Sequence, residues 1–301
     1  MDLTRRNLDA AFVGFQTAFN QGRSLYTPMW NRVAMRVPST TSGEQYDWLG
    51  DMPSLREWLG DRVIRQLKDH GFRIVNKSFE ATVSVKKERF EDDAIGIYAP
   101  MFQELGRSAT VHPDQLVFSL LGQGFTQNCY DGQFFFDTDH PVENADGTVS
   151  SVSNSGGGAG TAWYLLDMSR AIKPLIYQER KAPNLVRKDQ ETDDNVFHGR
   201  DLLYGVDYRG NVGFGLWQLA YASKQTLNAT NYEAARAAMM SLKGDNGLPL
   251  GVMPNLLVVP PSLEGPARRL LERDVDAAGA TNEWKGTAQL LLAPLLGLGE
   301  R

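Results

Sequence analysis

Cysteine is nearly absent from this sequence, because Cys129 is the only one among 301 residues. A single cysteine cannot form a disulfide within the chain, which fits a protein made and kept in a reducing cytoplasm. A chain of this length buries roughly three quarters of its unfolded surface, so its core needs no disulfide or metal. The sequence therefore excludes a small disulfide-stabilised scaffold.

Long apolar runs and a basic excess are also missing. The most apolar stretch, residues 290–298, is about half the ~20 residues that a membrane helix needs, and Pro294 interrupts it. The N-terminus lacks the apolar core of a secretory signal. With 31 Lys and Arg against 36 Asp and Glu, the formal net charge is -5, whereas chains whose main partner is nucleic acid are usually basic. We expect a cytoplasmically made protein of about two domains, with no membrane partner.

Candidates for catalysis are few. Asp137, Asp139 and His140, with Asp131 upstream, could hold a divalent metal or act as acid and base. Cys129 could be a nucleophile with His140 or His112 as its base. Neither group matches the spacing of a calcium loop, a zinc site or a known protease signature. We interpret both as structural and expect no catalytic residue, cofactor or metal. A metal-dependent hydrolase using Asp137, Asp139 and His140 is a less favoured alternative.

The N-terminal segment carries an amphipathic pattern. Leu8, Phe12, Phe15 and Phe19 recur every three or four residues, which predicts a helix over 1–22. Three phenylalanines close to a terminus need cover. Either the helix packs on its own domain, or it is an arm that docks on a neighbouring subunit.

A short repeated unit follows a polar loop over 38–43. Residues 47–51 and 57–61 both read acid-Trp-Leu-Gly-Asp, with Trp48 and Trp58 at equivalent positions. Two large aromatics in a segment rich in glycine and charge favour an extended projection that contacts something else.

The middle of the chain changes from strand to helix pattern. Apolar residues alternate over 79–86, which predicts a half-buried strand. Helical spacing then predicts a long, kinked element between 92 and 127, with Asp92 or Asp93 as its N-cap. The Ser/Gly stretch 150–160 predicts a flexible linker.

The C-terminal half mixes helices and strands without regular alternation, which predicts an α+β fold. Residues 187–195 predict a charged loop. The remaining predicted elements are strands over 163–166, 175–177, 256–259 and 289–292, and helices over 216–222, 231–243 and 262–273, with Asn231 and Ser262 as N-caps.

Distinctive phrases run from one end of the chain to the other. They are Glu57–Arg62, Asn76–Glu80, Glu91–Gly96, Cys129–Gln133, Phe136–Pro141, Trp163–Asp167, Lys173–Ile176, Gly213–Ala220 and Leu257–Pro261, followed by Asn282. In this order they resemble the Mu-like phage major head subunit (gpT) family of tailed-bacteriophage major capsid proteins. The resemblance covers the whole chain.

This resemblance implies the tailed-phage major capsid protein fold. Residues 1–37 would form the N-terminal arm and 38–80 an extended β-hairpin loop. Residues 81–160 would form a peripheral domain with a long spine helix. Residues 161–301 would form an axial domain that returns strands to the peripheral one.

The implied function is structural and not enzymatic. Copies would assemble into pentamers and hexamers of an icosahedral phage head around double-stranded DNA, made in the host bacterial cytoplasm and located in the virion. An encapsulin-like compartment is the alternative with the same fold. The apolar anchors between subunits would be Phe12, Phe15, Phe19, Trp48 and Trp58.

Partners follow from the same resemblance. We expect a separate scaffolding protein and a portal during assembly, and a decoration protein is an open alternative. The acidic wall would contact DNA weakly and without sequence specificity. Lys68, Lys77 and Asn282 are present, but we predict no covalent cross-link between subunits.

Overall fold

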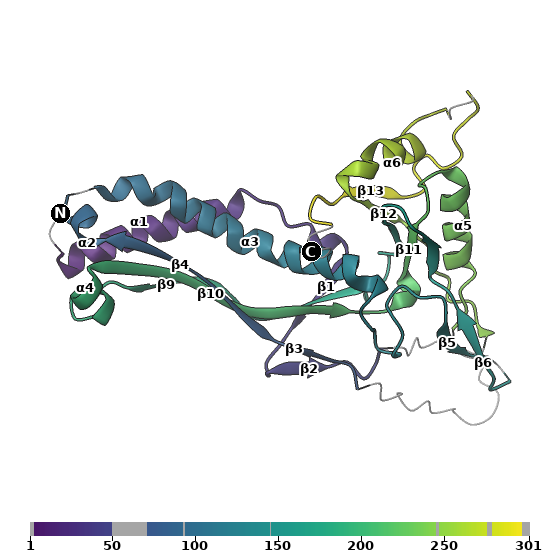
Figure 1. Ribbon diagram of the computed structural model, residues 1–301, viewed down its shortest axis with the longest axis horizontal. Coiled ribbons are helices and arrows are strands. Elements are labelled where there is room, and N and C mark those ends of the chain that lie inside the picture. The colour runs from purple at the N-terminus through teal and green to yellow at the C-terminus, as the bar shows by residue number, and fades with distance from the viewer. Residues whose placement is uncertain are drawn as a thin grey trace.

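The computed structural model describes residues 3–49, 71–92, 94–144, 146–244, 247–275 and 279–296. These residues form an elongated layer of long strands and helices, joined at one end to a compact body with a second sheet (Figure 1). Two hydrophobic clusters divide in the same way, one beneath the long helices and one centred on the compact body.

A four-stranded sheet in the order β1-β9-β10-β4 forms the elongated layer. β10 runs antiparallel to both β9 and β4, whereas β1 runs parallel to β9. Helices α1 and α3 cover one face of this sheet (Figure 1). The bounds are α1 Arg5–Ser24, β1 Ala34–Pro38, β4 Lys77–Lys86, α3 Ala99–Gly122, β9 Leu175–Lys188 and β10 Asp201–Phe214.

The predicted long helical element is α3 with a short 3-10 helix at each end, Ala94–Tyr98 and Gln123–Phe125. Pro113 lies inside α3, where it removes a backbone N–H from the helix ladder. The residue that caps α3 is Tyr98 and not Asp92, because Asp92 ends the short helix α2 (Lys87–Glu91). Asp93 lies outside the described residues. The predicted strand over 79–86 is part of β4.

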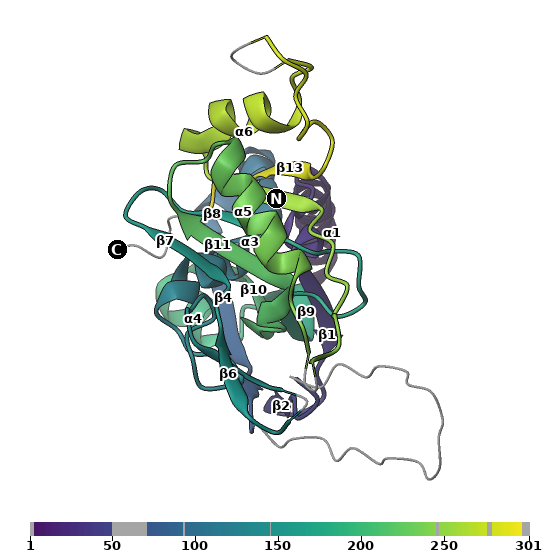
Figure 2. The same cartoon turned by 90° about the vertical axis from the view of Figure 1, so that its right-hand side faces the viewer.

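The compact body is built on a five-stranded sheet in the order β13-β12-β8-β11-β7. All residues of β8 and β12 are buried. α5 lies across β11, and α6 contacts β12 and β13 (Figure 2). The bounds are β7 Ser155–Gly158, β8 Trp163–Leu166, β11 Ala220–Lys224, α5 Ala229–Met240, β12 Leu256–Val259, α6 Glu264–Leu271 and β13 Gln289–Leu292.

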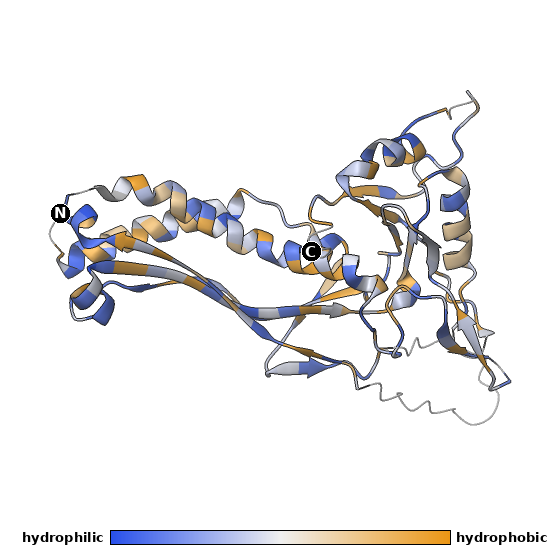
Figure 3. Cartoon of the chain, in the orientation of Figure 1, coloured by the Kyte–Doolittle hydropathy of each residue, from blue (hydrophilic) through white to orange (hydrophobic). Residues whose placement is uncertain are grey.

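Smaller elements complete the described chain. β2 (Gly43–Gln45) pairs antiparallel with β3 (Arg73–Val75), and β5 (His140–Glu143) with β6 (Val149–Val152). The short helix α4 (Asp194–Gly199) separates β9 from β10. Figure 3 shows apolar and polar residues in alternating bands along the helices and long strands.

The predicted flexible linker over 150–160 is wrong, because this stretch contains β6 and β7. β7 pairs with β11 through its backbone, which needs no apolar side chains. Its glycines make the approach possible: a Cβ on Gly156 would lie 2.7 Å from Ser223 Oγ, and one on Gly158 would lie 2.5 Å from Gln225 N. Small residues here indicate close packing and not freedom.

The predicted helix over 216–222 is also wrong. Trp217–Leu219 form one 3-10 turn, and β11 then begins at Ala220. Both faces of β11 are covered, so its apolar run carries no strand alternation, and a buried helix cannot be told from a buried strand by periodicity alone. The predicted loop over 187–195 begins too early, since β9 continues through Lys188.

The helices near the C-terminal end are where the sequence predicts them, but their caps differ. Asn228 and not Asn231 caps α5, and its side chain accepts a hydrogen bond from Asn231 N. Leu263 stands at the N-cap of α6 in place of Ser262, which lies in a preceding 3-10 turn. The strands over 256–259 and 289–292 are confirmed as β12 and β13.

Candidate functional site

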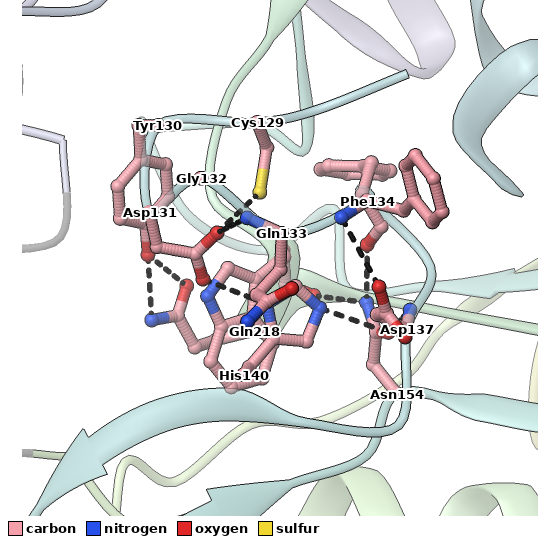
Figure 4. Close-up of polar contacts among 12 residues, drawn as sticks. Cys129, Tyr130, Asp131, Gly132, Gln133, Phe134, Asp137, His140, Asn154 and Gln218 are labelled. Atoms are coloured by element: carbon pink, nitrogen blue, oxygen red, sulfur yellow. Dashed lines mark hydrogen bonds and ion pairs between the residues drawn. The ribbon is translucent and has the colours of Figure 1, made fainter. Parts of the chain in front are cut away.

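Three of the residues that the sequence singles out for chemistry meet in one buried cluster (Figure 4). His140 Nδ1 lies 2.7 Å from Asp131 Oδ2. Cys129 Sγ donates to Asp131 Oδ1 at 3.0 Å, and Gln133 N donates to the same oxygen at 3.1 Å. The loop after α3 supplies Cys129 and Asp131, and the first residue of β5 is His140.

Trp217 and Asn154 hold the His140 ring in addition to Asp131. The ring stacks on Trp217 with centroids 4.0 Å apart and planes 9° apart. Its Nε2 lies 3.2 Å from Asn154 Oδ1, while Asn154 Nδ2 donates to Phe135 O at 2.8 Å. Both ring nitrogens therefore face oxygen atoms, and the side chain is fully enclosed.

The electrostatics of the cluster favour a structural role. Burial raises the pKa of Asp131, but hydrogen bonds from His140 and Cys129 outweigh it and hold that pKa below its ordinary value. Burial, with the charge of Asp131, raises the pKa of the Cys129 thiol far above its usual range. The thiol therefore stays protonated and donates a hydrogen bond, whereas a nucleophile needs the thiolate.

The arrangement that a hydrolase would need is not assembled. Asp137 accepts hydrogen bonds from Phe134 N at 3.2 Å and Thr138 N at 2.7 Å, so it closes a turn. Asp139 is exposed, and His140 faces Asp131 instead. His112 is on α3, against Tyr208 and Phe79, and burial lowers its pKa.

Metal binding has one possible donor set among the described residues. The ligand atoms of Cys129, Asp131 and His140 all lie within 4.8 Å of one another. Each of these atoms already has a hydrogen-bond partner inside the cluster. The set is therefore complete as a hydrogen-bonded unit, and we expect no metal there.

The candidate interface residues have different surroundings. Phe15 and Phe19 are buried within their own chain, and the Phe15 ring stacks on Phe102 with centroids 4.1 Å apart. Phe12 is half-buried under the Arg187 guanidinium. Of the two alternatives for the N-terminal helix, packing on its own domain describes this chain.

Only one of the two tryptophans of the repeated unit lies within the described residues. Trp48 is half-buried beside Tyr46, with centroids 5.9 Å apart. Trp58 lies outside the described residues.

Sequence reasoning missed the most exposed apolar side chains of the described residues, such as Phe197 at 76% and Leu25 at 70%. Neither belongs to a periodic apolar pattern, so no sequence signal marks them.

The fold defines the class of protein. The chain superposes on the procapsid subunit of bacteriophage JBD30 with a TM-score of 0.86 and 46% identity, covering 97% of this chain and 99% of that one. It also superposes on the JBD30 capsid decorated with minor capsid protein trimers, with a TM-score of 0.77, 34% identity and 90% and 92% coverage. This is the α+β fold of a tailed-phage capsid subunit.

The sequence comparison narrows the class to one family. The model of the Mu-like prophage major head subunit gpT matches residues 8–296. The major capsid protein of Escherichia phage Mu is 46% identical over 305 residues, which cover 98% of this chain and 100% of that protein. The chain belongs to the Mu-like gpT major head subunit family.

The protein is therefore a major capsid protein of a tailed phage, a structural component of the virion and not an enzyme. The encapsulin-like and hydrolase alternatives gain no support from these matches. Within the described residues, no helix combines the length and apolar character that crossing a membrane requires.

Proposed function

We propose that copies of this chain form the pentamers and hexamers of an icosahedral head around double-stranded DNA. The observation that carries this proposal is the nearly full-length superposition on the JBD30 procapsid subunit. One chain that fills five-fold and six-fold positions must make heterologous contacts, in which different surfaces of two copies meet. A relative solved both as a procapsid and as a capsid supports two packings of the same subunit.

The domain assignment is part of this proposal. Residues 1–37 are the arm, 38–80 the extended loop, 81–160 the peripheral domain, and 161–301 the axial domain with returning strands. The pairing of β2 with β3 supports a two-stranded base for the loop. β9 and β10 support the returning strands, because both pair in the peripheral sheet. β7 departs from this division, since it pairs with β11.

Contacts between copies use the residues that remain accessible. Phe12 and Trp48 are half-buried, so each can still lose surface to a neighbour. Trp58 stays an interface candidate from its sequence alone. For Phe15 and Phe19 to touch another copy, α1 would have to leave α3.

Other partners join during assembly. We infer a separate scaffolding protein and a portal from the family resemblance. A decoration protein is supported by the minor capsid protein trimers on the JBD30 capsid. DNA contact is weak, because the 36 acidic residues outnumber the 31 basic ones, whereas strong binding needs an excess of Lys and Arg to replace the counterions of DNA.

Subunits of the head stay uncross-linked in this proposal. Lys77 lies on β4, and Lys68 lies outside the described residues. The Asn282 amide already donates to Leu270 O and Arg273 O, both at 2.9 Å, which gives it a local structural role. A ladder of covalent oligomers on a denaturing gel of mature heads would contradict this.

Electron microscopy of the purified protein tests the main proposal. Closed shells are expected when the chain is produced with its scaffolding protein, and small discrete particles under all conditions would show it to be wrong. Production of the chain alone is the matched control. Uniform shells of the correct size from the chain alone would remove the need for a separate scaffold.

A further inference from the structure

A pocket rich in hydrogen-bond donors lies at one edge of the five-stranded sheet, beside β13. Its volume is about 500 Å³. The short 3-10 helix Trp30–Arg32 forms one wall, and β13 with the end of the loop that precedes it forms another. β13 is the last strand in the sheet order, so its outer edge has no neighbouring strand among the described residues.

Two cations line this pocket, Arg32 and Lys173. Arg32 donates to Gln289 Oε1 at 3.2 Å, and Lys173 donates to the carbonyl of Met168. A guanidinium has five N–H donors and an ammonium three, so most of their donors are unused. No carboxylate is among the residues that line the pocket.

Three amide side chains add to the donors. Asn31, Asn255 and Gln289 line the same pocket. Asn255 uses its Oδ1 to accept from Met168 N at 2.9 Å, and Gln289 uses its Oε1 for Arg32. The oxygen atoms of Asn255 and Gln289 are thus occupied, and the side-chain N–H groups of all three amides have no acceptor among the described residues.

Lysine and arginine side chains elsewhere in the described chain form ion pairs with carboxylates, which this pocket lacks. Lys86 pairs with Asp201 at 2.7 Å, and Arg268 pairs with Glu264 at 2.8 Å. Neither Arg32 nor Lys173 has such an ion pair among the described residues. A concave site with two unpaired cations and further donors is suited to an oxyanion.

We propose that this pocket receives an acidic side chain from a second copy of the chain. The inference rests on the proposed self-assembly and names one of its contacts. A carboxylate on a flexible side chain can enter a pocket of this size, whereas the phosphates of a stiff double helix cannot follow it inward. Each copy can supply the group, because Asp139, Glu233 and Glu283 are exposed and form no ion pair with another described residue.

Chemical cross-linking tests the contact directly. Shells are assembled from equal amounts of ¹⁴N-labelled and ¹⁵N-labelled chains and treated with a carbodiimide, which joins an ammonium to a carboxylate in contact with it. We expect peptides that join Lys173 of one isotope to an Asp or Glu of the other. Lys173 linked only within one isotope, or unlinked while other lysines react, would overturn the inference.

Substitution gives a second readout on the same pocket. Arg32→Gln and Lys173→Gln remove one cation each and keep a polar side chain. Lys243→Gln is the control, on an exposed lysine that forms no ion pair with a described residue. Each pocket variant should raise the concentration at which shells first form by about tenfold, which corresponds to one lost charged contact. Added salt should shrink that difference.

The outcomes separate this inference from the proposed function. Wild-type chains that form no shells with the scaffolding protein would refute self-assembly itself. Wild-type shells together with pocket variants that assemble as the control does would refute only the pocket contact. Variant shells that assemble normally but release DNA at lower salt would assign the pocket to phosphate and also refute it. Circular dichroism of the unassembled chains excludes misfolding as the cause.

Discussion

The helix α1 and the segment from Cys129 to Asn154 are both attached to a larger body, but by opposite means. α1 lies on α3 through apolar rings and close backbone contact: a Cβ on Gly106 would lie 2.0 Å from Phe19 O, and one on Gly22 would lie 1.8 Å from Gln103 O. The 129–154 segment is held by a buried carboxylate, an imidazole and an amide. Close packing therefore holds α1 on α3, whereas hydrogen bonds hold the 129–154 segment.

The polar attachment has the larger expected effect on stability. His140→Ala leaves the Asp131 carboxylate buried without its main partner, so we expect the free energy of unfolding to fall by about 3 to 5 kcal/mol. Urea unfolding of the unassembled chain measures this. His198→Ala is the control, because His198 is exposed on α4, and it should change stability by less than about 0.5 kcal/mol. Equal effects of the two changes would contradict the structural role of the cluster.

A single added methyl group should disrupt the packing of α1 on α3. In Gly106→Ala the new Cβ overlaps the backbone of α1, which cannot move aside as a side chain can, and we expect a loss of about 3 kcal/mol. Gly14→Ala on α1 is the matched control, since nothing lies within 4 Å of its Cβ position. It should stabilise the helix by about 0.5 to 1 kcal/mol. A stable Gly106→Ala chain would mean that the helices can separate without cost.

Acid should weaken the polar attachment selectively. Because the pKa of Asp131 is lowered in the folded chain, its contribution is present above the ordinary carboxyl pKa and is lost as pH falls through the lower folded value. The stability difference between wild type and Asp131→Asn should be constant near neutral pH and shrink below about pH 4. Unfolding curves over this pH range measure it, and a difference independent of pH would disprove the assignment.

The smallest effect is expected on the face of the four-stranded sheet that the helices leave open. Lys181 and Asp207 form an ion pair there with both side chains almost half exposed. Lys181→Ala should lower the free energy of unfolding by less than about 1 kcal/mol, because solvent screens exposed pairs. A larger loss in urea unfolding would show that this pair contributes more than its exposure implies.

Periodicity predicted the elements that have one buried face. The apolar spacing of Leu8, Phe15 and Phe19 predicted α1, and the alternation over 79–86 predicted most of β4. β10 was missed although its alternation is present, because Leu202, Tyr204, Val206 and Tyr208 are buried and the residues between them are less so. Gly205, Asp207 and Gly210 are residue types that strands disfavour, which lowers the strand propensity of this stretch.

The site was predictable only in part. The sequence places Cys129, Asp131 and His140 within twelve residues, which suggested a cluster. It does not show that His140 turns toward Asp131 and away from Asp139, because Trp217 and Asn154, which orient the ring, come from distant segments. Phe197 is exposed on the short helix α4, and no periodic apolar pattern in the sequence marks it.

Two long strands, β9 and β10, run through both hydrophobic clusters of the subunit. β9 and β10 are 14 residues each, about 45 Å at ~3.3 Å per residue. Both supply residues to the two hydrophobic clusters, with Leu185 and Tyr204 in one and Tyr177 and Phe214 in the other. The same two strands thus connect the two hydrophobic clusters. A force applied to the compact body would therefore act on the far end of the four-stranded sheet through the hydrogen bonds between β9 and β10.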